Sequence, residues 1–122
     1  MQRLPRRALG TALAGIVLLA TVTACGSDDK AGSTDEVVTV DITVENGEIT
    51  PKGDRVEVAA GQPVDLVVTA DTAGSLHMHS DPEQEFAYDV GTKTFPITID
   101  RPGVIEVESH DPPQIIVQLE VR

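Results

Sequence analysis

Cysteine and aromatic residues are almost absent from this chain. Of its 122 residues, Cys25 alone carries a thiol, tryptophan does not occur, and phenylalanine and tyrosine together number three. A single cysteine excludes an intrachain disulfide, a zinc site built from several thiolates and a CxxC redox pair. The chemistry of the folded chain therefore cannot depend on paired thiols.

Basic residues are also scarce. Nine lysines and arginines stand against 20 aspartates and glutamates, and three of the nine, Arg3, Arg6 and Arg7, lie at the very start of the chain. Nucleic-acid binding needs clusters of Lys and Arg to neutralise phosphates, so the composition excludes a nucleic-acid partner. The acidic surplus either keeps an exposed domain soluble or attracts cations and basic partners, and composition leaves both readings open.

The chain lacks a long hydrophobic run. Its longest, residues 8–20, has 13 residues, whereas a helix that crosses a bilayer needs roughly 20. The run follows the three arginines and is followed by small residues at 22–24. This pattern predicts a cleaved export signal at residues 1–24.

The position of Cys25, directly after this segment, resembles the bacterial lipobox. The resemblance implies that the Cys25 thiol receives a lipid, that the peptide is cut just before it, and that the protein is anchored at the extracytoplasmic face of the cell membrane. Two or more acyl chains give a stable anchor. The alternatives are a plain secretory signal with an incidental cysteine, or a cysteine that pairs with another protein.

Removal of residues 1–24 leaves 98 residues, which is enough for one domain. Residues 25–36 begin with Cys25 and continue with small, polar and acidic residues, so they predict a flexible linker. Residues 37–122 form the predicted domain. From Cys25 onward, six basic residues face 20 acidic ones, a formal net charge of −14.

From residue 37 onward, apolar residues recur at every second position. Val38, Val40, Ile42 and Val44 alternate with polar residues, as in a half-buried strand. Similar short stretches follow between turns that contain glycine and proline, and none has the 3.6-residue period of an amphipathic helix. Seven or eight such strands predict an all-β fold, an antiparallel sandwich or barrel.

Local features assign roles to some of these strands. The β-branched, mostly apolar stretch 64–70 predicts a central strand. Pro96 lacks a backbone N–H and therefore predicts an edge strand over residues 94–99. Residues 71–75 are expected to form a loop, and residues 81–91 show no clear pattern.

The three histidines are the strongest candidates for chemistry. His77 and His79 are two positions apart, which places both on one face of a strand. If the strand that ends at His110 lies beside theirs, the three imidazoles converge and suit copper, zinc or nickel with an open coordination position. In a regular strand, however, His110 shares a face with Glu106 and Glu108 and points outward.

Acidic residues close to the histidines in sequence are candidate partners that orient the imidazoles: Asp81, Glu83, Glu85 and Asp111. Met78 either packs in the core with Leu76 or joins the ligands as a soft thioether, which favours Cu(I). The alternation favours packing. The alternative for the histidines themselves is that they are solvated or hydrogen-bonded groups with no ligand.

Catalytic patterns do not stand out. Ser109 and His110 are strand neighbours that face opposite ways, so adjacency alone does not make them a nucleophile and base. The sequence has no Gly-rich phosphate loop and no HExxH motif. We therefore expect a protein that is not an enzyme.

The stretch from about Val38 to Val121 resembles the cupredoxin-like domains of bacterial secreted proteins and lipoproteins. The resemblance is carried by Gly61-Gln62-Pro63-Val64, Leu76-His77-Met78-His79, the segment from Arg101 to His110, and Leu119-Glu120-Val121. It implies a Greek-key antiparallel β-sandwich in which His77 takes the place of the first copper-binding histidine.

The chain departs from the cupredoxin pattern at the copper-binding cysteine. Gly103, Ile105 and Val107 match the frame that precedes it, but Ser109 stands in its place, and no His or Met follows His110. A type 1 blue-copper centre needs that thiolate, so electron transfer through such a centre is not expected.

The sequence thus predicts a lipid-anchored, extracytoplasmic, non-catalytic domain that binds a divalent metal, with Cu(II) favoured over zinc. The expected ligands are His77, His79 and His110. The alternative is a metal-free sandwich that serves as a protein-interaction or accessory module at the cell surface, with the histidines as incidental or pH-sensitive surface groups.

Overall fold

The computed structural model describes residues 35–122 and folds them into nine strands, with no helix in that range. The strands are β1 (Val38–Glu45), β2 (Glu48–Thr50), β3 (Asp54–Val58), β4 (Pro63–Ala70), β5 (Gly74–Met78), β6 (Gln84–Tyr88), β7 (Gly91–Thr98), β8 (Gly103–His110) and β9 (Pro113–Val121). The predicted export signal, Cys25 and nearly all of the predicted linker lie outside the described residues. Across residues 35–122, no helix is long and apolar enough to cross a membrane.

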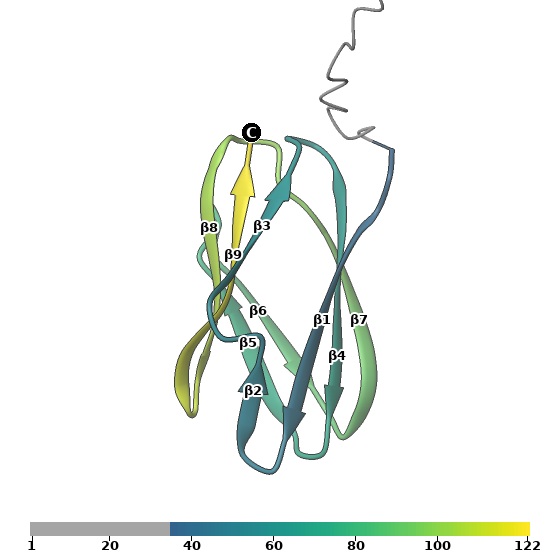
Figure 1. Ribbon diagram of the computed structural model, residues 1–122, viewed down its shortest axis with the longest axis vertical. Coiled ribbons are helices and arrows are strands. Elements are labelled where there is room, and N and C mark those ends of the chain that lie inside the picture. Colours follow the sequence, from purple (N-terminus) through teal and green to yellow (C-terminus); the bar gives the residue numbers. More distant parts are fainter. Residues whose placement is uncertain (1–34) are drawn as a thin grey trace, which may run out of the picture.

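The strands form two sheets that face each other (Figure 1). One sheet has the order β2-β1-β4-β7, and the other has the order β3-β9-β8-β5-β6. The predicted all-β sandwich is confirmed. β4 is flanked by β1 and β7, as expected for a central strand, and β7 with Pro96 lies at an edge.

Both sheets are mixed, which corrects the expectation of a purely antiparallel sandwich. β1 and β4 pair in parallel, and so do β3 and β9, while the other pairs are antiparallel. The chain leaves the first sheet after β2, adds β3 to the other sheet, and returns to place β4 beside β1. This excursion supplies the long connection that parallel neighbours require.

Period-two alternation builds the core. In β1, Val40, Ile42 and Val44 are buried and their polar neighbours are exposed. In the neighbouring strand β4, Val64, Leu66 and Val68 are fully buried, and Leu66 and Val68 lie beside Val40 and Ile42. Each fully buried side chain of this size contributes roughly 1.5–3 kcal/mol. The aliphatic layer between the sheets therefore holds together a domain that has few aromatic residues.

Turns join strands where the sequence provides left-handed backbone conformations. Asn46 and Gly47 have φ values of 55° and 79° and connect β1 to β2 in a hairpin. Two consecutive residues with positive φ match the right-handed twist of the flanking strands, which is why Asn-Gly predicts a tight turn.

The sequence did not predict the start of β5 or the strand β6. β5 begins at Gly74, within the expected loop 71–75, because Gly74 and Ser75 pair with Tyr88 and Ala87 of β6. β6 itself lies in the stretch without a clear pattern. In β5, pairing with the next strand along the chain imposes an extended backbone on Gly74 and Ser75, which favour turns.

The two ends of the described chain meet at one end of the sandwich. The amide of Gln62 donates to the carbonyl of Glu36 (2.8 Å), and the backbone N–H of Ala60 donates to the carbonyl of Arg122 (2.9 Å). The β8–β9 turn lies at the opposite end, at the lower left of Figure 1.

Candidate metal centre

β5 alternates between the core and the outer face of its sheet. Leu76 and Met78 are fully buried. His77, between them, points outward, and its side chain is 24% exposed. His79 follows the last residue of β5, and its backbone N–H donates to the carbonyl of Glu106 on β8 (2.9 Å). Met78 therefore packs in the core, as the alternation favoured.

β8 supplies the other half of the site by the same alternation. Val107 and Ser109 face inward and are buried, while Glu108 and His110 face outward. The register with β9 shifts between Val107 and Glu108 so that Ile116 of β9 is skipped, and β8 keeps its own period.

His110 points outward, as its position in the strand predicted, and this direction brings it to the histidines. His77 pairs with Glu108 across the β5–β8 ladder. The outer face of β5 and the outer face of β8 are thus continuous, and side chains that point outward from both strands meet there.

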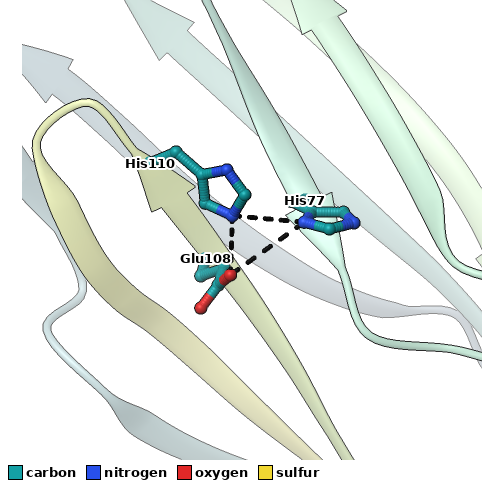
Figure 2. Close-up of side chains that lie close together, drawn as sticks. All are labelled: His77, Glu108 and His110. Atoms are coloured by element: carbon teal, nitrogen blue, oxygen red, sulfur yellow. Dashed lines mark hydrogen bonds and ion pairs between the residues drawn. The ribbon is translucent and has the colours of Figure 1, made fainter.

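Three ligand atoms converge at this face (Figure 2). The Nδ1 atom of His77 lies 3.2 Å from Nε2 of His110 and 3.9 Å from Oε1 of Glu108. The Nε2 atom of His110 lies 2.7 Å from the same Glu108 oxygen. One Nε2 proton cannot be given in full to both neighbours, whereas a cation can accept electron pairs from all three atoms.

The three distances fit a small divalent ion. Metal–nitrogen bonds of 2.0–2.1 Å in a tetrahedral site place neighbouring ligand atoms roughly 3.3 Å apart. The observed separations lie on both sides of that value, so shifts of about half an ångström suffice to admit an ion. His77, Glu108 and His110 are a group that can hold a metal ion.

His79 joins the cluster through carboxylates. Its Nε2 atom lies 2.8 Å from Oε1 of Glu108, and its Nδ1 atom lies 3.4 Å from Oε1 of Glu83. The other Glu83 oxygen lies 3.4 Å from Nε2 of His77. The structure therefore brings all three predicted histidines together. His79 bonds directly to Glu108 of the convergent group, and its ring centroid lies 4.8 Å from that of His77.

The contacts between imidazoles and carboxylates shift two pKa values. The hydrogen bond that His79 donates to Glu108, with smaller contributions from Glu83, raises the pKa of His79 above its ordinary value of 6.5. Hydrogen bonds from His79 and then His110 lower the pKa of Glu108 below its ordinary value of 4.5. Glu108 is thus held as a carboxylate, which is the form that binds a cation.

Glu108 is the site residue that sequence reasoning missed. The sequence places it on the same strand face as His110, and that shared face is the available signal. Of the expected acidic partners, Glu83 contacts two histidines. Asp81 instead pairs with Arg101, and Glu85 lies opposite His77 in the β5–β6 ladder.

The site is open to solvent. His110 is 67% exposed, and Glu108 is 23% exposed. A hollow of about 110 Å³ lies beside the two imidazoles and is lined by Ser75, His77, Glu85 and His110. An ion held here keeps coordination positions for water or for a donor on another molecule.

Comparison with protein-family models gave no match, and comparison with curated proteins gave no significant match. The geometry of the histidine and carboxylate cluster is therefore the basis for a functional proposal.

Proposed function

We propose that this protein binds a divalent metal ion, Cu(II) before Zn(II), at the outer face of a lipid-anchored β-sandwich, and captures or delivers the ion at the extracytoplasmic surface. The observation that supports the proposal most directly is the convergence of His77 Nδ1, His110 Nε2 and Glu108 Oε1. The role is non-catalytic.

The donor atoms favour a particular class of ion. Imidazole suits copper, zinc and nickel, while thiolate and thioether select Cu(I). The site offers two ring nitrogens and a carboxylate oxygen, and the nearby thioether of Met78 is fully buried on the other face of β5. This set suits Cu(II) or Zn(II) and lacks the thiolate of a blue-copper centre.

The cupredoxin-like part of the proposal rests on the two-sheet sandwich and on the sequence resemblance. If the domain is cupredoxin-like, its proposed metal site lies on the outer face of the sheet and not at the position of the copper-binding cysteine. Ser109, which stands in the place of the copper-binding cysteine, points inward and is buried. Its sequence neighbours Glu108 and His110 point outward, and they are the proposed ligands in place of that cysteine.

The test is a titration of the mature protein, purified in detergent, with Cu(II) and Zn(II) by calorimetry. We expect saturable binding, and Glu108→Gln should weaken it by about 10-fold or more, because the carboxylate is a ligand and also orients two histidines. Glu106→Gln is the matched control. Glu106 precedes Glu108 on the same face of β8 and receives a hydrogen bond from Gln118 (3.0 Å), so its substitution should leave the affinity within about threefold.

A metal-free interaction module is the second candidate. One observation favours it: Glu83 and Glu108 already provide each histidine with a partner. The absence of saturable binding, or binding that survives both His77→Ala and His110→Ala, would establish this alternative and overturn the metal proposal.

The lipid anchor is tested separately at Cys25. Without its thiol no acyl chain can be attached, and two acyl chains are what hold such a protein at a membrane. We expect Cys25→Ser to release the protein into the medium or to leave it unprocessed, as measured by fractionation and mass spectrometry. A variant that remains in the membrane fraction at normal mature size would contradict the anchor.

A further inference from the structure

We infer that the cluster holds two metal ions and that the His77 imidazole bridges them. The inference rests on the proposed metal binding and adds a second site to it. The first ion is bound by His77 Nδ1, His110 Nε2 and Glu108. The second is bound by His77 Nε2, His79 Nδ1 and the carboxylate of Glu83.

The two ring nitrogens of His77 face two different acidic groups. Its Nδ1 atom lies 3.2 Å from His110 Nε2 and 3.9 Å from Glu108 Oε1, while its Nε2 atom lies 3.4 Å from Glu83 Oε2. Nδ1 and Nε2 point away from each other across an imidazole ring. Ligands for one ion therefore lie on one side of the ring, and ligands for another lie on the opposite side.

The second side has the composition of a site in its own right. Glu83 Oε2 lies 3.4 Å from His77 Nε2, and Glu83 Oε1 lies 3.4 Å from His79 Nδ1. Two ring nitrogens and a carboxylate are the same donor set as in the first site, and they suit the same ions. The two nitrogen–oxygen separations are close to the roughly 3.3 Å expected between neighbouring ligands of a tetrahedral ion, so Glu83 can offer one oxygen beside each imidazole.

The segment that carries Glu83 is linked to the rest of the cluster through both histidines. Glu83 lies between β5 and β6, and its side chain is 62% exposed, so it can adjust to an ion without disturbing the core. Its i,i+4 spacing from His79 and its contact with His77 keep it over the two imidazoles. Glu108 occupies the corresponding position on the β8 side.

The cluster can release the proton and supply most of the negative charge that such a pair of ions requires. When both nitrogens of His77 are coordinated, the ring gives up its remaining N–H proton to the solvent and becomes an imidazolate with one negative charge. That charge, together with the Glu83 and Glu108 carboxylates, offsets three of the four positive charges of two divalent ions. With bonds of 2.0–2.1 Å on each side of the ring, the ions lie about 6 Å apart.

The experiment measures the copper content of the mature protein and its electron paramagnetic resonance. The protein is loaded with Cu(II) and freed of weakly bound ion by gel filtration. We expect two ions per chain. The spin signal should rise up to the first equivalent and then fall as the second is added, because an imidazolate bridge couples the two spins antiferromagnetically.

Three variants locate the second site. Glu83→Gln should weaken the affinity for the second ion by about 10-fold or more and change the affinity for the first ion by less than about threefold. The variant should therefore give the uncoupled signal of one copper ion. His79→Ala should also remove the second ion. Because it also takes away the hydrogen bond to Glu108 (2.8 Å), it should weaken binding of the first ion as well. Glu106→Gln is the matched control. It removes one negative charge from β8 at a carboxylate that accepts a hydrogen bond from Gln118 (3.0 Å), and it should retain two coupled ions.

Each outcome separates this inference from the proposed function. Failure of the wild-type chain to bind any ion overturns the proposed function and, with it, the bridge. Saturation at one ion, with the same value in Glu83→Gln, overturns the bridge and leaves the function standing. Two ions with uncoupled spins, or two ions that persist in both Glu83→Gln and His79→Ala, also overturn the bridge.

Discussion

The inner and outer faces of β5 and β8 are one residue apart in sequence and serve different purposes. Leu76 and Val107 point inward and are fully buried. Their neighbours His77 and Glu108 point outward and pair with each other across the ladder. The same pleat therefore builds a packed layer on one side and a histidine–carboxylate cluster on the other.

The buried side chains of the inner face position the site, and the side chains of the outer face form it. Ligands placed on adjacent strands are held by the packed core beneath them, which is a more rigid support than a loop. The outer side chains contribute little to the free energy of unfolding, because exposed ion pairs are worth about 0–1 kcal/mol. A change on one face should thus affect stability, and a change on the other should affect metal binding.

The largest expected effect comes from Leu76→Ala. The variant removes a fully buried side chain, and the resulting cavity should cost about 2–5 kcal/mol in the free energy of unfolding, measured by urea denaturation. His77→Ala, one residue away, should cost less than about 1 kcal/mol and abolish the tight metal binding. Similar losses of stability in the two variants would remove the distinction between the faces.

A smaller effect is expected from Met78→Leu. The two side chains have similar volume, so the substitution should cost less than about 1.5 kcal/mol. Metal affinity and stoichiometry should stay unchanged, because Met78 points into the core. A loss of copper binding in a folded Met78→Leu protein would show that the thioether is a ligand and that the inner face takes part in the site.

The smallest expected effect is a pH dependence of the metal-free protein. The folded-state pKa of His79 is raised above 6.5, so its contribution to stability is fully present below pH 6.5 and is lost as the pH rises through the folded-state pKa. The folded-state pKa of Glu108 is lowered below 4.5, so its contribution is present above pH 4.5 and is lost as the pH falls through the lowered value.

The measurement compares the melting temperatures of wild type and His79→Gln in the presence of a chelator. The difference should be greatest between pH 4.5 and 6.5 and should narrow at higher pH, as His79 loses its proton. A difference that widens above pH 8 would mean that the outer-face contacts do not depend on the charge of His79.

Local sequence pattern was sufficient for much of the fold. The alternation of Val40, Ile42 and Val44 with polar residues correctly predicts a half-buried strand, and Pro96 correctly predicts an edge strand. The parallel pairing of β1 with β4 was not foreseen, because side chains alternate with the same period in parallel and antiparallel strands. Gly74 and Ser75 favour turns locally, and only their pairing with β6 extends them.

The candidate site was predictable to the same degree. The spacing of His77 and His79 placed them on one face, and the parity of His110 correctly gave its direction. What parity cannot supply is which strands are neighbours. Because β5 lies beside β8 and His77 lies opposite Glu108, the outward-pointing His110 reaches the other histidines. Glu108 accepts hydrogen bonds from both His79 and His110.

The positions of the chain ends have a consequence for a tethered protein. Glu36 and Arg122 are bonded to the same short segment, 59–62, at one pole of the sandwich, while the turn from β8 to β9 lies at the far pole (Figure 1). A tether leading from residue 35 back to a lipid would hold the near pole toward the bilayer. The histidine cluster, on the outer face of β5 and β8, would then remain uncovered by the membrane and open to incoming ions and proteins.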